Sequence, residues 1–186
     1  MTECPEEFRW LSDCEDLDEI YCVSFVRGLA PDEVLRRFTV DENTLEECDA
    51  ADCIGTAKIG DWTLVVEPGG WLLAADPEIY TRVGRGTEIV SVCRHDYAAD
   101  TFAYIVGGEP VVEFEPVLPD DRSGTDPDRF IKEMREIGLD PDHDIDGPAI
   151  DFPIERSFVL ASRITGLHFS PEMLELCSFR AEPRES

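Results

Sequence analysis

The chain has 186 residues, enough for one domain with a substantial core and too few for two domains of ordinary size. It carries 42 acidic residues against 16 basic ones, which gives a formal net charge of -26. Phosphate backbones and anionic lipid head groups are bound through lysine and arginine, so a surface of this charge repels both. The composition therefore excludes direct nucleic-acid binding and membrane-surface binding from the functions we expect.

The first residues, MTECPEEFRW, contain neither the basic region nor the apolar region of a secretory signal. No apolar stretch approaches the ~18 residues that a transmembrane helix needs. Scattered thiols in a chain without a visible export signal are expected to be reduced and partly buried, which predicts a cytoplasmic protein. The seven cysteines are Cys4, Cys14, Cys22, Cys48, Cys53, Cys93 and Cys177.

The first part of the chain predicts a short helix over 6–13 and then a strand over 19–26. That strand, EIYCVSFV, is apolar on both faces and rich in β-branched and aromatic residues, as is typical of an interior strand. A helix is expected from Pro31, because its acidic residues precede its basic ones and complement the helix dipole. A further helical piece is predicted over 44–51. Arg27 ends the apolar strand, so its charge must reach water or a carboxylate.

The middle of the chain has the pattern of antiparallel β structure. Strands are predicted over 56–59 and 62–67, joined by a glycine turn, and a helix is predicted over 76–83. The segments TEIVSVCR and TFAYIVGGEPVVEFEP supply three more strands, the last two joined by a pair of glycines. Their alternation predicts one packed face and one face that is partly exposed to solvent.

The last third is predicted to be helical. Asp126 is expected to begin a helix that Gly138 ends, and two more helices are expected over 154–164 and 171–177. We therefore predict a single α+β domain, residues 1–186, with an ordered core over about 6–178 and a short polar tail over 179–186. Its sheet is mainly antiparallel, with about five or six strands and flanking helices.

An acidic loop over 140–151 contains half of a calcium-binding pattern. Asp142, Asp144, Asp146 and Gly147 match D-x-D-x-D-G, in which alternate carboxylates converge on a cation. The twelfth position is Pro153, so the bidentate carboxylate that closes such a site is missing. Two interpretations stay open: a solvated loop without a cofactor, or a site for a weakly bound divalent cation.

Other motifs identify no catalytic residue. The segments VGRGTE (83–88) and RSGTDPDR (122–129) come nearest to phosphate-binding loops, but both lack a lysine, so we interpret them as connections. Cys22 and Cys93 lie within predicted strands, where small buried side chains are the ordinary reading and a redox pair is the alternative. The enzyme question stays open, and the balance favours a protein without catalytic activity.

Several segments together carry a family resemblance: CVSFVRGLAPDEVLRRF, IGDWTLVVEPGGW, GTEIVSVCRH, SGTDPDRF and RITGLHFSPEMLE. With them the chain, from about residue 10 to residue 176, resembles an uncharacterised actinobacterial family with a domain of unknown function. Its acidity and α+β architecture are also similar to those of bacterial immunity proteins that neutralise toxins. The first resemblance implies kinship without known catalytic residues, and the second implies a protein partner.

These observations favour a non-enzymatic acidic protein that binds a basic protein partner, such as a toxin domain, as an immunity protein or antitoxin does. The alternatives are an enzyme or small-ligand regulator with a divalent metal in the acidic loop, a nucleic-acid mimic, and a subunit of a larger assembly. The residues expected to bind the partner are Asp142, Asp144, Asp146, Trp62 and Trp71.

Overall fold

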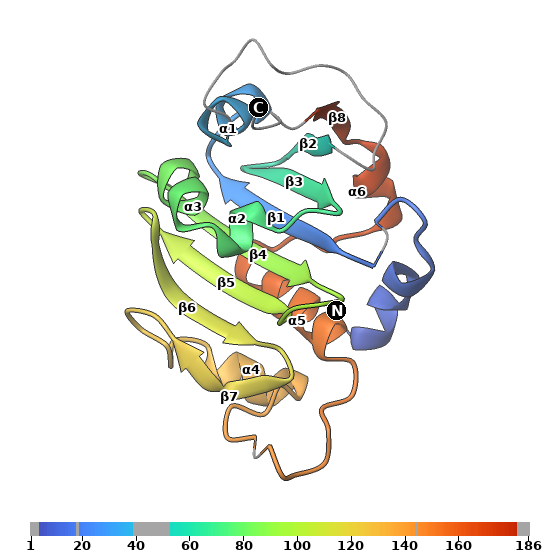
Figure 1. Ribbon diagram of the computed structural model, residues 1–186, viewed down its shortest axis with the longest axis vertical. Helices are drawn as coiled ribbons and strands as arrows, with labels where there is room; N and C mark the ends of the chain where they lie inside the picture. Colours follow the sequence, from blue (N-terminus) through green and yellow to red (C-terminus); the bar gives the residue numbers. More distant parts are fainter. Residues whose placement is uncertain (1–3, 18, 39–52, 144, 182–186) are drawn as a thin grey trace.

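The computed structural model describes residues 4–17, 19–38, 53–143 and 145–181 (Figure 1). Its strands are β1 (Tyr21–Arg27), β2 (Cys53–Ile59), β3 (Trp62–Pro68), β4 (Glu88–Arg94), β5 (Thr101–Val106), β6 (Glu109–Glu115), β7 (Leu118–Ser123) and β8 (Ser178–Ala181). Its helices are the 3₁₀ helix η1 (Pro5–Asp13) and the α-helices α1 (Pro31–Phe38), α2 (Leu72–Ala75), α3 (Pro77–Val83), α4 (Ile131–Ile137), α5 (Pro153–Thr165) and α6 (Pro171–Glu175).

The strands form one sheet in the order β7-β6-β5-β4-β1-β3-β2-β8, and every neighbouring pair is antiparallel. The predicted α+β class is confirmed, with helices on both sides of the sheet (Figure 1). The predicted strand number is wrong, since the described residues form eight strands and not five or six. The two additional strands, β7 and β8, lie at the two edges.

The edge strands escaped prediction because their residues lack the expected pattern. The sequence of β7, LPDDRS, has no apolar alternation, and its pairing with β6 is irregular. Strand β8 begins where a frayed tail was expected, and its residues pair with β2 in the register Gly55↔Phe179. A Cβ atom on Gly55 would lie 2.5 Å from the Phe179 ring, so this glycine makes room for the ring. The tail prediction is therefore wrong for 179–181.

The helix predicted to begin at Asp126 begins five residues later, at Ile131. The preceding segment is attached to β6, because the backbone N–H groups of Thr125 and Asp126 donate to the carbonyls of Pro110 and Val111. These bonds hold the segment along the sheet and keep it from entering the helix. The helical piece expected over 44–51 lies outside the described residues.

Two apolar layers cover the sheet. On one face, η1, α4, α5 and α6 pack on the strands around a column of rings in which Phe158 lies 5.5 Å from both Phe8 and Phe169. On the other face, α1, α2 and α3 pack on Val26, Val65 and other small apolar residues. The predicted interior strand β1 is confirmed, since all of its residues except Arg27 are buried. A partly exposed face was predicted for β4 to β6. It is wrong for β4 and β5, whose central residues are all buried, whereas Glu113 and Glu115 of β6 are partly exposed.

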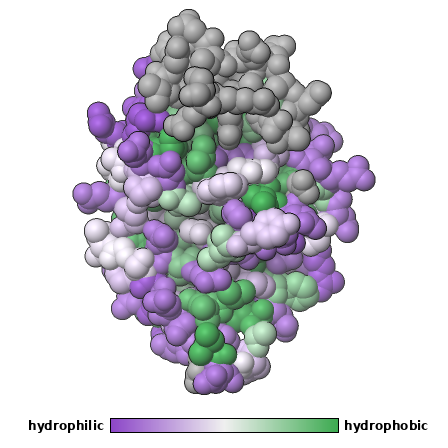
Figure 2. Space-filling model, in the orientation of Figure 1, coloured by the Kyte–Doolittle hydropathy of each residue, from purple (hydrophilic) through white to green (hydrophobic). Residues whose placement is uncertain are grey.

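The surface is mostly polar outside these layers. In the view of Figure 2, hydrophilic residues predominate and apolar residues form separate groups between them. Within the described residues, no helix is both long enough and apolar enough to cross a membrane. Cys53 is disulfide-bonded, so the expectation that the thiols are reduced is wrong at this position. The free thiols among the described residues belong to Cys4, Cys14, Cys22, Cys93 and Cys177.

Candidate functional site

The acidic loop follows α4 at the β7 edge of the sheet. The Asp142 carboxylate accepts from Arg135, with a distance of 2.8 Å between Nη2 and Oδ2, and Asp146 is exposed. Asp144 lies outside the described residues. The described part of the chain contains no group of three or more histidine, cysteine, aspartate or glutamate side chains that could hold a metal ion. The cation-binding interpretation of this loop stays a prediction.

The two tryptophans predicted to bind a partner lie at opposite ends of β3. Trp62 begins the strand and is buried, with the Arg27 guanidinium 5.7 Å from its ring centroid. Trp71 follows the strand and is 41% exposed. Four strands separate β3 from β7 in the sheet, so neither tryptophan joins the acidic loop in a single site.

The two strand cysteines are neighbours across β1 and β4. Cys22 lies opposite Cys93 in the register of the two strands, and both side chains are buried beneath α2. Burial raises the pKa of the Cys22 thiol well above its ordinary value, which disfavours the reactive thiolate. The interpretation of Cys22 and Cys93 as small buried side chains is confirmed, and the redox pair stays a prediction.

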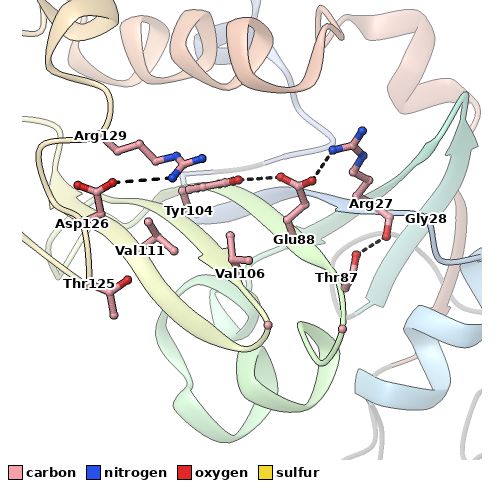
Figure 3. A pocket seen from close by; sticks show the side chains of 12 residues that line it. Arg27, Gly28, Thr87, Glu88, Tyr104, Val106, Val111, Thr125, Asp126 and Arg129 are labelled. Atoms are coloured by element: carbon pink, nitrogen blue, oxygen red, sulfur yellow. Dashed lines mark hydrogen bonds and ion pairs between the residues drawn. The ribbon is translucent and has the colours of Figure 1, made fainter.

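A hollow of about 750 Å³ lies at the end of the sheet where β1 ends and β4 begins (Figure 3). We call it the turn-end hollow. Three segments meet there: Arg27 and Gly28 at the end of β1, 86–88 at the start of β4, and 125–129 before α4. Strands β5 and β6 supply the floor, with Tyr104 in its centre.

A chain of polar contacts crosses the turn-end hollow. Arg27 Nη1 lies 2.5 Å from Glu88 Oε1, and the Tyr104 hydroxyl donates to Glu88 Oε2 over 2.7 Å. Burial alone would raise the pKa of Glu88, but the hydrogen bonds from Arg27 and Tyr104 outweigh it and lower that pKa. Burial, followed by the bond to Glu88, raises the pKa of Tyr104 to about 12. Glu88 is therefore ionised and Tyr104 neutral near pH 7.

Arg129 lies on the other side of the Tyr104 ring. Its guanidinium carbon is 5.6 Å from the centroid of that ring and 5.9 Å from the centroid of Phe130. Its carboxylate partner is Asp126, at a distance of 3.8 Å between Nη1 and Oδ2, which is too long for a hydrogen bond. The two rings thus hold the cation in place while its N–H groups stay available.

The sequence analysis considered these segments separately and interpreted them as connections. VGRGTE supplies Glu88, RSGTDPDR supplies Arg129, and Arg27 was noted for a charge that needs a partner. Only the register of the sheet shows that they meet, because Val26 lies opposite Ile89 and Glu88 lies opposite Val106. No signal in one segment alone could have predicted this hollow.

Exposed aromatic side chains form a second region at the other end of the sheet, which we call the aromatic patch. The rings of Trp71 and His95 meet edge to face, with centroids 4.8 Å apart. The backbone N–H of Tyr97 donates to His95 Nδ1 over 3.2 Å, and the Tyr97 side chain is 87% exposed. Trp71 was predicted as a partner-binding residue, and Tyr97 was missed.

Two carboxylates hold the backbone beneath the aromatic patch. The buried Glu67 accepts from the N–H groups of Leu72 and Leu73, over 2.8 and 3.2 Å, at the start of α2. Asp100 accepts from the backbone N–H of His95 over 2.9 Å, and burial raises its pKa. These bonds fix the residues that follow Trp71 and the residue on which its ring rests.

The fold and these regions define a single-sheet α+β protein with a charged hollow at one end and exposed rings at the other. A family model described as a family of unknown function, DUF6461, matches residues 38–182. The chain therefore belongs to this family, which confirms the predicted kinship with an uncharacterised family and leaves the quoted segments and the immunity likeness as predictions. No curated protein and no solved structure matches the chain.

Proposed function

We propose that this protein is a non-enzymatic binding protein that docks on a basic protein partner through the aromatic patch. The observation that carries the proposal is the exposure of Trp71 and Tyr97, which both contact His95, Trp71 through its ring and Tyr97 through its backbone N–H. Tryptophan and tyrosine dominate the binding energy of protein interfaces because each buries a large ring at a small entropic cost. Such side chains gain free energy when a partner removes them from water.

The Trp71 ring and the backbone of Tyr97 are held in place before a partner arrives. Trp71 packs on His95, and His95 is tied to the backbone of Tyr97 and to the carboxylate of Asp100. Ordering flexible side chains costs free energy on binding, so the ordered Trp71 ring favours association. The aromatic patch therefore presents a preorganised Trp71 ring to a partner.

Charge indicates the chemistry of the partner. The chain has a net charge of -26. Asp96 precedes Tyr97 in the sequence, and Glu78 lines a hollow beside Trp71; both carboxylates are exposed. Long-range attraction steers a basic protein toward such a surface, and lysine or arginine side chains bind the faces of tryptophan and tyrosine. A basic toxin domain has this chemistry. Binding to such a domain is how an immunity protein neutralises it.

The test begins with capture of proteins from the host on immobilised chain at low and at moderate salt, followed by purification of the captured protein. Binding of the purified partner is then measured by calorimetry for Trp71→Ala and Tyr97→Ala. We expect each variant to raise Kd by at least about tenfold, as is typical of the loss of an aromatic anchor. Far-ultraviolet circular dichroism checks that both variants are folded.

Ile145→Ala is the matched control, because Ile145 is a 72% exposed apolar residue of the acidic loop. We expect this variant to leave Kd within about twofold of the wild-type value. Weakening by Ile145→Ala, with no effect of Trp71→Ala or Tyr97→Ala, would move the interface to the acidic loop and overturn the proposal. Capture of no basic protein at either salt concentration would also overturn it.

A further inference from the structure

We propose that the turn-end hollow binds a small organic anion, with a carboxylate or phosphate group against Arg129 and Arg27 and an apolar body against the floor. The site lies at the opposite end of the sheet from the aromatic patch and does not depend on the function proposed above. It rests on three observations, which concern the guanidinium groups, the charges around them and the shape of the floor.

The first observation is that both guanidinium groups keep unused donors. Among the residues that the structure describes, the Arg129 guanidinium donates no hydrogen bond, and the Arg27 guanidinium donates one, to Glu88. Arg122 is more fully used, since it donates to the Asp128 carboxylate and to the carbonyls of Pro119 and Pro141. A guanidinium has five N–H donors in a planar fork that fits a carboxylate or phosphate, so these two cations can accept a further anion.

The second observation is that the acidic groups of the hollow leave these N–H donors unused. One oxygen of Glu88 accepts from Arg27 and the other accepts from Tyr104, so Glu88 holds Arg27 in place. Asp126 approaches Arg129 only to 3.8 Å and is exposed. Both guanidiniums contribute to the lowered pKa of Glu88, which places both positive charges within electrostatic reach of the same point. The Glu88 carboxylate and the Tyr104 hydroxyl lie between the two guanidinium groups (Figure 3), so an incoming anion meets the N–H groups of Arg27 and Arg129 that these contacts leave unused.

The third observation is an apolar floor beside the cations. Val106 is 42% exposed although it ends the central strand β5, and Val111 and the Tyr104 ring lie on the same floor (Figure 3). Gly86, with a φ of 72°, has open space where a Cβ atom would point, so no side chain narrows the hollow at this position. A hollow of about 750 Å³ has the size of ordinary small-molecule sites, which combine an apolar wall with a few polar groups.

The net charge of the chain limits the ligand to a small one. A nucleic acid would bring many phosphates against a surface of charge -26, whereas a single anionic group between two arginines interacts mainly with them, because salt screens charges beyond about 8 Å. The chemistry therefore points to one oxyanion group on a compact apolar body.

The test uses benzoate and phenyl phosphate as probes, titrated into the full chain and followed by chemical-shift changes in ¹H–¹⁵N spectra. Probes of this size are expected to bind with a Kd of about 1 to 10 mM. Shifts should gather at residues around Arg129 and Gly86. The two probes distinguish a carboxylate ligand from a phosphate ligand, and inorganic phosphate, which lacks the apolar body, should bind more weakly than phenyl phosphate.

Variants decide whether the arginines carry the binding. Arg129→Gln and Arg27→Gln should each raise Kd about tenfold, since each removes charge-assisted hydrogen bonds to the probe. Arg135→Gln is the matched control: it removes one exposed positive charge from α4, outside the hollow, and should change Kd less than about twofold.

Arg129→Gln is the decisive variant, because the Arg129 guanidinium makes no hydrogen bond to the described residues whose loss could unfold the chain. Equal weakening by Arg129→Gln and Arg135→Gln would mean that only net charge matters and would overturn the proposal. The absence of shifts at the hollow with both organic probes would overturn it as well. Trp71→Ala should leave probe binding unchanged, so failure at one end of the sheet is distinguishable from failure at the other.

Discussion

The two ends of strand β1 use the same residue types in opposite ways. At the Arg27 end, the Glu88 carboxylate pairs with a guanidinium and a hydroxyl, and rings lie against cations. At the Tyr21 end, the Glu67 and Asp100 carboxylates accept only backbone N–H groups in the bonds described above, and rings face water. One end is built to present cations and the other to present aromatic surface.

Burial acts on the carboxylates of both ends, and their partners decide the outcome. Burial raises the pKa of Glu88 and of Asp100, but two strong hydrogen-bond donors reverse the direction for Glu88. Asp100 has one backbone donor and weaker charge contributions from Arg94 and His95, and its pKa stays raised. A carboxylate in this fold is therefore a counterion or a backbone cap according to the donors that the register places beside it.

The largest expected effect is at the aromatic end, for Glu67→Ala. Removal of this fully buried carboxylate leaves the N–H groups of Leu72 and Leu73 without their acceptor. An unsatisfied buried donor costs about 1 to 3 kcal/mol, so we expect a loss of about 2 to 4 kcal/mol in the free energy of unfolding. Urea denaturation measures this loss.

Glu67→Gln is the control for the Glu67 prediction, since it keeps one acceptor oxygen at the start of α2. We expect it to recover part of the lost stability. If Glu67→Ala were as stable as the wild type, the backbone cap would contribute nothing, and the contrast between the ends would be reduced to a difference in exposure.

A smaller effect is expected at the charged end, for Tyr104→Phe. The change removes the hydroxyl that donates to Glu88 over 2.7 Å and keeps the ring beneath Arg129. One hydrogen bond to a charged group is lost, so the free energy of unfolding should fall by about 1 to 2 kcal/mol in urea denaturation.

Tyr97→Phe is the matched control at the aromatic end. The Tyr97 side chain is almost fully exposed, so removal of its hydroxyl should change stability by less than about 0.5 kcal/mol. Equal effects of the two substitutions would show that the Tyr104–Glu88 bond is no stronger than a bond to water.

The central strands could be predicted from the sequence because their apolar runs and glycine turns are local signals. Strands β1 to β6 lie within a few residues of the predicted ranges. The edge strands could not be predicted in this way, since β7 is polar and β8 is held by its pairing with β2 and by the space above Gly55. Edge strands are commonly short and rich in charged residues, which protects their unpaired backbone groups from pairing with other chains and removes the apolar pattern.

The sites were predictable only in part, for a related reason. Trp71 was singled out because tryptophan is a residue type that anchors protein interfaces. Tyr97, between Asp96 and Ala98, was overlooked. The turn-end hollow needed the register of four strands, and no property of Arg27, Glu88 or Arg129 alone reveals that they meet.

The smallest expected effect compares the pH dependence of Glu88→Gln at the charged end with that of Asp100→Asn at the aromatic end. The folded pKa of Glu88 lies below its ordinary value of 4.5, so its ionised form stabilises the fold above about pH 4.5. That contribution is lost as the pH falls through the folded pKa. Glu88→Gln should therefore be less stable than the wild type at pH 7, and the difference should vanish in acid.

For Asp100, the effect of ionisation on stability has the opposite sign. Its folded pKa lies above the ordinary value of 3.8, so the folded state takes up a proton more readily and loses stability as the pH rises through the interval between the two values. Asp100→Asn removes that loss and keeps an oxygen that can accept from His95, so it should be more stable than the wild type at pH 7 and equal to it in acid. Each difference should be below about 1 kcal/mol, because both groups are partly exposed. Urea denaturation of both variants and the wild type at the same pH values cancels the titration of the other carboxylates. Differences of the same sign at pH 7 would contradict the assignment of Glu88 as a counterion and Asp100 as a backbone cap.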